Sequence, residues 1–542
     1  MKVMSLLLIV LAAAMFTGCS DDKGDSPDPT MIGRAFLSLS LQSSTGPSTR
    51  ANTEEKPGSA EESKAENVEV LLFDENELCL GVESVTSGTI GNSSGGSASN
   101  PSAEASDAIA VSAKTKKVFV VINPYTTGWD FTADAVKGKT WTEINTTLTN
   151  AKADNIATDN SFMMVSEGDK TTISKGALTD VATNIKIPDD YTPEKIEAAK
   201  TAAKASPAEV NVDRLACKVT VTKAADADFT IKPTGAKFTF SGWELSVTNK
   251  SVRLYSDLVD YDNKTVGAVY RKDKNYSEAE HNGLSTTASL RAAFDYLENI
   301  DKESDVMPSV DNADKANAYC LENTMEAKMQ KLGFTTKVVV KAKYTPKDIT
   351  ENTSYFSWAG KFYTLDALKT AYNNTASGGL KKDLPEFLHK AKLMADEVFN
   401  GTDEQKAQAI TALTADKFNE KTGIIGRFCA VRYYHESVCY YDVLIRHDKN
   451  ITQKMALGRY GVVRNNWYSI ELKSVTGPGT PWIPDPSDPG PTPTDPDNPA
   501  PDPDDPNNPT PPDVDDDEND AYLSVKITIN PWTFWTQDAE LH

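Results

Sequence analysis

Two short segments near opposite ends of the chain alternate strictly between apolar and polar residues. They span residues 37–41 and residues 523–529. A period of two is typical of a half-buried β-strand, because every second side chain then faces a core. Polar stretches separate both segments from the rest of the chain, so the pattern predicts two detached strands, the second interrupted by Asn530-Pro531. The apolar positions are Leu37, Leu39 and Leu41 in the first strand and Leu523, Val525, Ile527 and Ile529 in the second.

The middle of the chain also has a strand-rich pattern. Short apolar runs at 68–73, 118–122, 162–165 and 215–221 lie between turn-rich segments, a spacing typical of a β-sandwich. A second strand-rich region begins near residue 228. The pattern therefore predicts a mainly β chain with more than one domain, since 542 residues are too many for a single core.

Helices are expected in two places. The first is Pro193–Lys204, within the first strand-rich region. The second is a block at about 363–419, whose middle helix places apolar residues from Leu384 to Val398 on one face and ends at Asn400-Gly401. This block interrupts the second strand-rich region and is predicted to be an insertion in its domain.

A long acidic and proline-rich segment precedes the second detached strand. Residues 478–512 hold fifteen of the chain's 29 prolines. Such a composition does not build a core and favours an extended, polyproline-like tether. At about 3.1 Å per residue, the 47 residues of 474–520 reach at most roughly 150 Å.

The first residues predict export. Lys2 precedes an apolar run at 6–15, which suits a signal-peptide core and is too short to span a bilayer. The run ends in Thr17-Gly18-Cys19, and small residues before a cysteine resemble the lipobox of bacterial lipoproteins. We expect a signal peptide at 1–18 and a lipid on Cys19; an ordinary secretory signal with an incidental cysteine is the alternative.

A detached apolar strand has unpaired backbone groups and must join a sheet. Both strands either join their own fold or take part in strand exchange. In the exchange, a trypsin-like protease cuts between Arg50 and Ala51, the first strand leaves, and the C-terminal strand of another copy fills its groove. This head-to-tail contact does not close on itself and gives a filament. Arg34 is a competing basic site, and a cut there would leave the first strand in place.

Composition and motifs narrow the function further. A net charge of −22 argues against binding to nucleic acid or to anionic membrane surfaces. No CxxC pair is present, so neither a disulfide scaffold nor a zinc site is expected, and Cys429 and Cys439 either pair across a hairpin or remain buried thiols. The sequence contains no metal-ligand histidine spacing and no nucleotide-binding or hydrolase motif, so we predict no enzyme, cofactor or metal. The aromatic residues at 433–435 and 440–441 favour packing over glycan binding.

Several strings identify a family by resemblance. They are Asn123-Pro124 after a valine-rich strand, VDRLA at 212–216, ENT at 322–324, RYGVVRNNWY at 459–468 and INPW at 529–532. Together with the lipobox they resemble the Bacteroidetes fimbrillins, also called type V pilins, and most closely the major subunit of the minor (short) fimbriae.

The resemblance implies two transthyretin-like β-sandwich domains, removal of the first strand after an arginine, and polymerisation through the C-terminal strand. Arg50 lies where that arginine is expected. The expected organisation is a signal peptide at 1–18, a propeptide with the first strand at 19–50, an N-terminal β-sandwich at 51–225, a C-terminal β-sandwich with a helical insertion at 226–473, a linker at 474–520 and a donor strand at 521–542.

These observations predict a structural shaft subunit of a surface fimbria that supports cell adhesion. Its expected partners are other copies of itself, accessory fimbrial subunits, outer-membrane lipid through Cys19 before processing, and the maturing protease. The sequence does not identify a surface receptor. The alternative is a surface lipoprotein that does not polymerise, either a fimbrial anchor or a protein that binds glycan or protein.

Overall fold

Valine-rich and other β-branched segments form the inner strands of the structure, which is mainly β. The computed structural model describes residues 27–43, 56–86, 106–159, 161–168, 176–259, 270–284, 286–297, 317–425, 429–448, 451–483 and 523–533. Lys117–Ile122 and Lys337–Thr345, for example, are central strands whose side chains are mostly buried. β-Branched side chains pack well on such pleated surfaces. The prediction of a mainly β chain is confirmed.

The first half of the chain builds a seven-stranded sheet in the order β2-β13-β11-β7-β4-β5, with β12 beside β7. Strand β1 pairs with β6 instead, so the first segment of the chain contributes to two sheets. The elements are β1 Arg34–Leu37, β2 Leu39–Ser43, β3 Lys56–Pro57, α1 Ala60–Ser63, β4 Asn67–Phe73, β5 Cys79–Thr86, β6 Ile109–Ser112, β7 Lys117–Ile122, α2 Ala133–Val136, α3 Trp141–Ile144, β8 Thr147–Thr149, β9 Ala157–Thr158, β10 Ser161–Phe162, β11 Met164–Ser166, β12 Thr179–Asp180, α4 Pro193–Lys204 and β13 Ala208–Arg214.

The second half, together with β3 of the first half, builds a six-stranded sheet in the order β22-β14-β28-β29-β3, with β15 beside β28. It also builds a three-stranded sheet β16-β23-β27. The strands are β14 Ala216–Lys223, β15 Thr230–Ile231, β16 Lys237–Ser246, β17 Thr248–Asn249, β18 Ser251–Arg253, β19 Asp257–Val259, β20 Tyr270–Lys272, β21 Phe294–Asp295, β22 Asn317–Leu321, β23 Lys337–Thr345, β24 Tyr355–Trp358, β25 Lys361–Tyr363, β26 Arg432–Tyr434, β27 Val438–Leu444, β28 Asn466–Val475 and β29 Leu523–Thr533. The helices are α5 Glu278–Asn282, α6 Thr287–Ala293, α7 Leu365–Asn374, α8 Leu380–Lys390, α9 Asp396–Phe399, α10 Asp403–Ala412 and α11 Glu420–Ile425.

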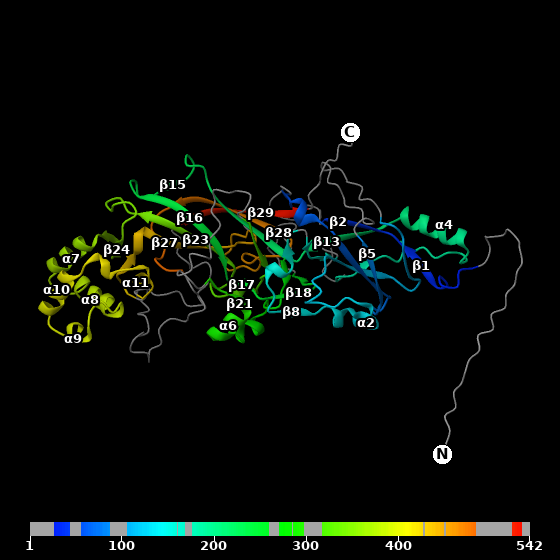
Figure 1. Ribbon diagram of the computed structural model, residues 1–542, viewed down its shortest axis with the longest axis horizontal. Coiled ribbons are helices and arrows are strands. Elements are labelled where there is room, and N and C mark those ends of the chain that lie inside the picture. The colour runs from blue at the N-terminus through cyan, green and yellow to red at the C-terminus, as the bar shows by residue number, and fades with distance from the viewer. Residues whose placement is uncertain are drawn as a thin grey trace, which may run out of the picture.

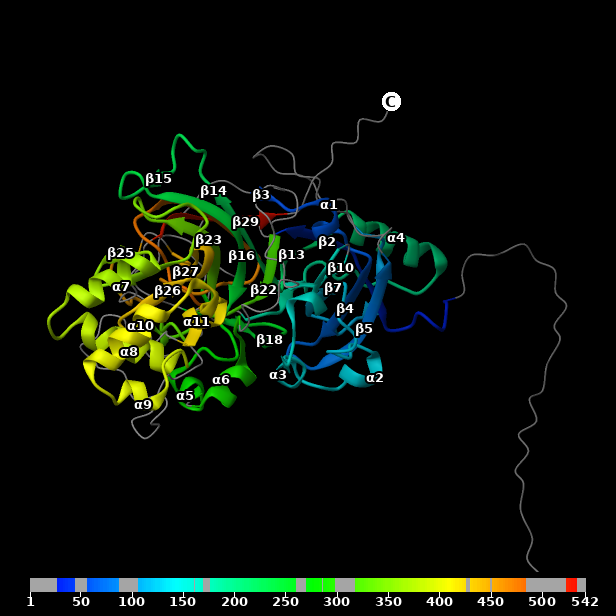
Figure 2. The same ribbon diagram turned by 60° about the vertical axis from the view of Figure 1, so that its left-hand side comes forward.

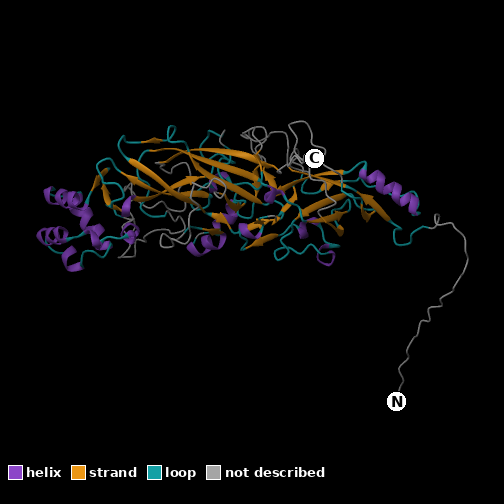
Figure 3. Ribbon diagram, turned by 45° about the horizontal axis from the view of Figure 1, so that its top comes forward, coloured by secondary structure: helices purple, strands orange, loops and turns teal. Residues whose placement is uncertain are grey.

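The molecule is elongated, with its two halves side by side (Figures 1 and 2). The helices α7 to α10 form a lobe at one end, while α4 lies toward the other end (Figure 3). The lobe has its own apolar cluster, in which Leu384, Phe387 and Leu388 of α8 pack against Phe356 of β24. Helices therefore lie where the helical block was predicted, between β25 and β26, and they are far from the first strand.

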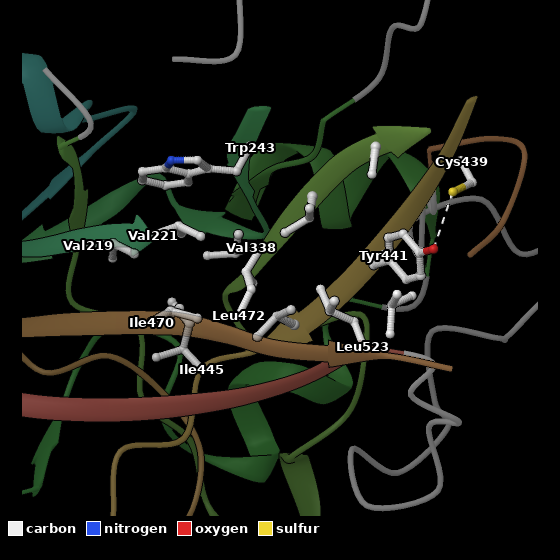
Figure 4. Close-up of a cluster of buried hydrophobic side chains, with 14 of the residues drawn as sticks. Val219, Val221, Trp243, Val338, Cys439, Tyr441, Ile445, Ile470, Leu472 and Leu523 are labelled. Carbon is white, nitrogen blue, oxygen red and sulfur yellow. Dashed lines mark hydrogen bonds between the residues drawn. The ribbon is translucent and has the colours of Figure 1, made fainter. Parts of the chain in front are cut away.

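The core of the second half lies between its two main sheets. Val219 and Ile470 of the larger sheet pack with Trp243 and Val338 of the smaller one, and all four are fully buried (Figure 4). Two further clusters fill the first half, one on each face of its seven-stranded sheet. The first of these contains the apolar side chains of β1 and β2.

Three sequence predictions need correction. The run at 215–221 was expected in the N-terminal sandwich, but β14 pairs with β22 and β28 of the second half, so the sheets change at Leu215. The predicted helix from Leu384 to Val398 is broken after Lys390, because Lys392 has a φ of 58° that no α-helix continues through. Asn530-Pro531 does not interrupt the last strand, which runs to Thr533.

Cys429 and Cys439 are buried thiols that are not joined to each other, in agreement with one of the two alternatives from the sequence. The Cys439 thiol donates to the Tyr441 hydroxyl at 3.4 Å. No helix in the described part of the chain is long and apolar enough to cross a membrane. Among the same residues, no group of histidine, cysteine and acidic side chains is arranged to hold a metal ion.

Candidate strand-exchange site

The first strand lies at the edge of the N-terminal half and supplies part of its core. Strand β2 runs parallel to β13, with Leu39 opposite Ala208 and Leu41 opposite Val210. Strand β1 runs antiparallel to β6. The side chains of Leu37, Leu39 and Leu41 are at most 3 % exposed and belong to one apolar cluster with β4, β7 and β13.

The other face of this segment is buried as well, although a half-buried strand was expected. Phe36 is 1 % exposed and packs against Ile196, Ala199 and Ala203 of α4. Ser38 is fully buried, and its hydroxyl donates to the carbonyl oxygen of Ser106. The Ser106 hydroxyl in turn accepts the amide proton of Leu39 at 2.9 Å. The sequence pattern missed Phe36 and Ser38 because the covering helix and loop are remote in the chain.

The C-terminal strand β29 lies in the other half of the same chain. It runs antiparallel to β28 and pairs on its other side with β3, where Trp532 lies opposite Lys56. Leu523 is 4 % exposed and lies in the core of the second half (Figure 4). Val525 is partly buried against the same cluster. Ile527 and Ile529 pair through their backbones with Ile470 and Tyr468. In the single chain, both detached strands therefore join their own fold.

The two basic sites differ in what the structure describes. Arg34 begins β1, its amide donates to Met31 O at 2.9 Å, and its guanidinium donates to Glu83 at 2.9 Å. A protease needs an extended, accessible backbone, which a paired strand does not offer. Cys19, Arg50 and Ala51 lie outside the described residues, so their predicted roles stay predictions.

A buried polar network joins the two halves next to the first strand. Asp213 pairs with Arg271 at 3.0 Å and accepts from Asn465 at 2.7 Å. Arg214 donates to the Asn465 side chain at 3.3 Å and to Glu62 O at 2.8 Å. Burial lowers the pKa of the Arg214 guanidinium to about 10. A buried, hydrogen-bonded network of this kind fixes the relative position of the elements it connects.

Glu62 lies at the edge of this network and links three elements. Its carboxylate accepts from Lys218 of β14 at 2.7 Å and from the Tyr319 hydroxyl of β22 at 2.5 Å. Burial alone would raise the pKa of Glu62, but the Lys218 ammonium and the hydrogen-bond donors outweigh it, so the pKa is lowered. The one sequence signal at Glu62 is its spacing from Ser59, which fits a capping box at the start of a helix. A capping box does not indicate that the glutamate side chain is buried.

Three of the five strings that carry the family resemblance contribute to this network. VDRLA contributes Asp213 and Arg214, ENT contributes Glu322, and RYGVVRNNWY contributes Arg464 and Asn465. Arg464 is buried, pairs with Glu322 at 3.2 Å and donates to Leu254 O at 3.0 Å. The strings are far apart in sequence, and their common role is to hold the junction between the two halves.

Several solved structures resemble the chain at low similarity. A putative cell adhesion protein from Bacteroides eggerthii is 11 % identical, with a TM-score of 0.38 and coverage of 93 % of this chain and 97 % of its own. A fimbrilin (FimA) from Porphyromonas gingivalis is 14 % identical, with a TM-score of 0.37 and coverage of 93 % and 98 %. The tip fimbrial protein Mfa3 from Porphyromonas gingivalis is 9 % identical, with a TM-score of 0.33 and coverage of 92 % and 100 %.

The family assignment rests on two family models. The model of the major fimbrial subunit protein (FimA) matches residues 35–214, and the model of the major fimbrial subunit protein type IV, fimbrillin, C-terminal, matches residues 432–538. Together they span more than half of the chain. Both describe structural subunits, which confirms the prediction that the chain is not an enzyme. The chain belongs to the fimbrillin family of major fimbrial subunits.

Proposed function

We propose that this fimbrial subunit forms the shaft of a surface fimbria by head-to-tail donor-strand exchange. In this proposal the chain is exported as a lipoprotein through Cys19, and a trypsin-like protease cuts between Arg50 and Ala51. The first strand then leaves, and the C-terminal strand of a second copy takes its place. The observation that carries the proposal is that an edge segment, which precedes the proposed cut, supplies core side chains to the N-terminal half.

The energetic argument starts from those side chains. Ala35, Leu37, Leu39 and Leu41 lie in the core cluster, and each leucine stabilises the fold by about 1.5–3 kcal/mol through burial. Loss of the segment would expose their partners and the backbone edge of β13 to water. An open, apolar edge associates readily with another strand. A processed subunit without a replacement strand is therefore strongly driven to bind one.

The position of Arg50 supports the order of events. It lies between β2, which ends at Ser43, and β3, which begins at Lys56, so a cut after it detaches β1 and β2 and retains β3 and α1. A cut after Arg34 would leave β2 beside β13. The retained segment is held by Glu62, whose carboxylate is buried against Lys218. The mature chain would thus keep its junction while losing its first strand.

The alternative is a surface lipoprotein that does not polymerise, and one observation favours it: β29 already pairs with β28 of its own chain. A fimbrial anchor would keep both strands in place. The glycan-binding version loses support, because Tyr433, Tyr434, Tyr440 and Tyr441 are all at most 3 % exposed. The closer similarity to the short-fimbria subunit stays a prediction.

The test is the N-terminal residue of sheared surface material, identified by mass spectrometry, with the same material run unboiled on a gel. We expect Ala51 at the N-terminus together with a ladder of polymers. The variant Arg50→Ala should remain a monomer with its first strand, whereas the matched variant Arg34→Ala should polymerise normally. A lipidated Cys19 in material that contains monomer only would refute the shaft-subunit proposal.

A further inference from the structure

The first strand and the C-terminal strand align over nine positions without a gap and share their apolar pattern over the first seven. Residues 35–43 read AFLSLSLQS, and residues 521–529 read AYLSVKITI. Alanine, leucine and serine recur at the first, third and fourth positions, and an aromatic residue stands at the second in both. Each aliphatic position in the first strand is aliphatic in the second. We propose that this match is the register of strand exchange, with Tyr522 of one copy filling the pocket of Phe36 in the next.

The Phe36 pocket is defined here by Ile196, Ala199 and Ala203 of α4 and by Ala110 of β6. These residues belong to the part of the chain that remains after the proposed cut. Lys200 of α4 lies with its ammonium 5.7 Å from the centre of the Phe36 ring, a distance typical of a cation–π contact. A tyrosine ring has the same aromatic face as phenylalanine, and its hydroxyl is usually directed toward a polar group or water. The pocket therefore suits the ring of Tyr522.

The buried serine position supports the same register. Ser38 is fully buried, and its hydroxyl donates to Ser106 O, while the next amide donates to the Ser106 hydroxyl. An apolar residue at this position would remove the hydroxyl that donates to the buried Ser106 carbonyl oxygen, which is costly. In the matched register the Ser524 hydroxyl takes the place of the Ser38 hydroxyl, and the Val525 amide takes the place of the Leu39 amide, so both hydrogen bonds are repeated.

Charge pairing accounts for the one position where the second sequence introduces a charge. Ser40 is 3 % exposed and lies opposite Glu209 in the parallel pair β2 and β13, while Glu209 itself is exposed. The matched register replaces Ser40 by Lys526. Cross-strand neighbours of opposite charge stabilise a sheet, and the long lysine stem lets the ammonium reach solvent. The similarity stops one position before these segments, where Asp520 aligns with Arg34. An aspartate cannot form the ion pair that Arg34 makes with Glu83.

Other registers lose these contacts. A shift of one residue turns the aliphatic side chains away from the core. A shift of two in one direction places Ser524 in the Phe36 pocket and leaves it unfilled. A shift of two in the other direction places Tyr522 at Ser38, where a serine is already fully buried. Only the matched register satisfies both positions.

The inference rests on the proposed strand exchange, and disulfide trapping separates the two. We expect the double variant Glu209→Cys with Lys526→Cys to form covalent ladders on a boiled, non-reducing gel of surface polymers. Paired residues on neighbouring strands lie within the Cα separation of roughly 4.4–6.8 Å that a disulfide needs. The control pairs, Glu209→Cys with Ser524→Cys or Thr528→Cys, are about two residues out of register and should give no ladder.

The disulfide-trapping experiment distinguishes a wrong register from a failure of strand exchange itself. A ladder with Ser524→Cys or Thr528→Cys, or polymers that none of the three pairs cross-links, overturns the register while strand exchange stands. If the wild-type chain forms no polymer at all, the proposed function and the register both fall. The five described cysteines, Cys79, Cys217, Cys320, Cys429 and Cys439, are buried and do not compete for the introduced thiols.

The pocket has its own test. Tyr522→Ala should shorten the lifetime of polymers against dissociation by about a hundredfold or more, because an aromatic-to-alanine change empties the pocket. Tyr522→Phe keeps the ring and should behave like the wild type. In the unprocessed chain, Phe36→Tyr should leave the thermal midpoint unchanged. Polymers of Tyr522→Ala as durable as those of Tyr522→Phe would overturn the assignment of the pocket.

Discussion

The substitution Glu62→Gln tests the buried junction most directly. The side chains of Glu62 and Lys218 are 3 % and 5 % exposed, and their charged atoms are 2.7 Å apart. Glutamine keeps the shape and can still accept from Tyr319, but it removes the negative charge that faces the buried Lys218 ammonium. The Trp467 ring lies 3.9 Å from the same ammonium and does not replace that charge. Breaking a buried pair in this way costs about 3–5 kcal/mol.

The assay is equilibrium unfolding in denaturant, followed by tryptophan fluorescence. A loss of 3–5 kcal/mol is a large share of the roughly 5–15 kcal/mol that holds a typical protein folded, so the midpoint should fall clearly. The matched control is Glu61→Gln on the adjacent, exposed side chain, which should change stability by less than about 0.5 kcal/mol. Adding Lys218→Met to Glu62→Gln should restore much of the loss, because the uncompensated charge is then removed.

The pH dependence adds an independent check. The pKa of Glu62 is lowered in the folded state, so its contribution is present above the unfolded pKa and is lost as pH falls through the folded value. The difference between wild type and Glu62→Gln should therefore be full at neutral pH and shrink below about pH 4. Equal midpoints for Glu62→Gln and Glu61→Gln at neutral pH would refute the reasoning.

Three further predictions address single positions. Gly461→Ala should destabilise the fold more than Gly360→Ala, as measured by thermal unfolding, because both have a positive φ but only at Gly461 would a Cβ meet a carbonyl oxygen, at 2.8 Å. The Cys439 thiol, whose pKa burial raises to about 11, should resist alkylation at pH 8 until the protein unfolds, and rapid labelling of the native chain would contradict this. Leu41→Ala should lower the stability of the unprocessed chain by about 2–5 kcal/mol in denaturant melts, whereas Ile32→Ala, on a side chain 63 % exposed, should have little effect.

The sequence was most informative where a local pattern decides the structure. The helix Pro193–Lys204 is found as predicted, since proline at its first position and a lysine at its end are local signals. The first strand is found because its alternation reflects the core it faces. The strand at 215–221 was also found, but its sheet was assigned wrongly. A strand's own side chains do not specify which distant strand pairs with it, and here the partner is β28, about 250 residues away.

The sequence identified only some residues of the candidate site, because the burial of the others depends on segments that are distant in the chain. Leu37, Leu39 and Leu41 were named from their period, whereas Phe36 and Ser38 looked like solvent-facing positions of a half-buried strand. Their burial depends on α4 and on Ser106, which no local pattern places there. The sequence also did not predict that Glu62 is a buried partner of Lys218 and Tyr319, because both residues are more than 150 positions away in the chain.

The pairing of β29 with β28 has a consequence for solubility and for assembly. Nine residue pairs join β29 to β28, whereas five join β2 to β13. An unassembled subunit thus covers its own open edges and is protected from indiscriminate aggregation. Under the proposed strand exchange, β29 would have to leave β28 before it pairs with a neighbouring subunit. The free energy of assembly would then be the difference between these two pairings, so substitutions that weaken the pairing of β29 with β28 should make the proposed filament more stable.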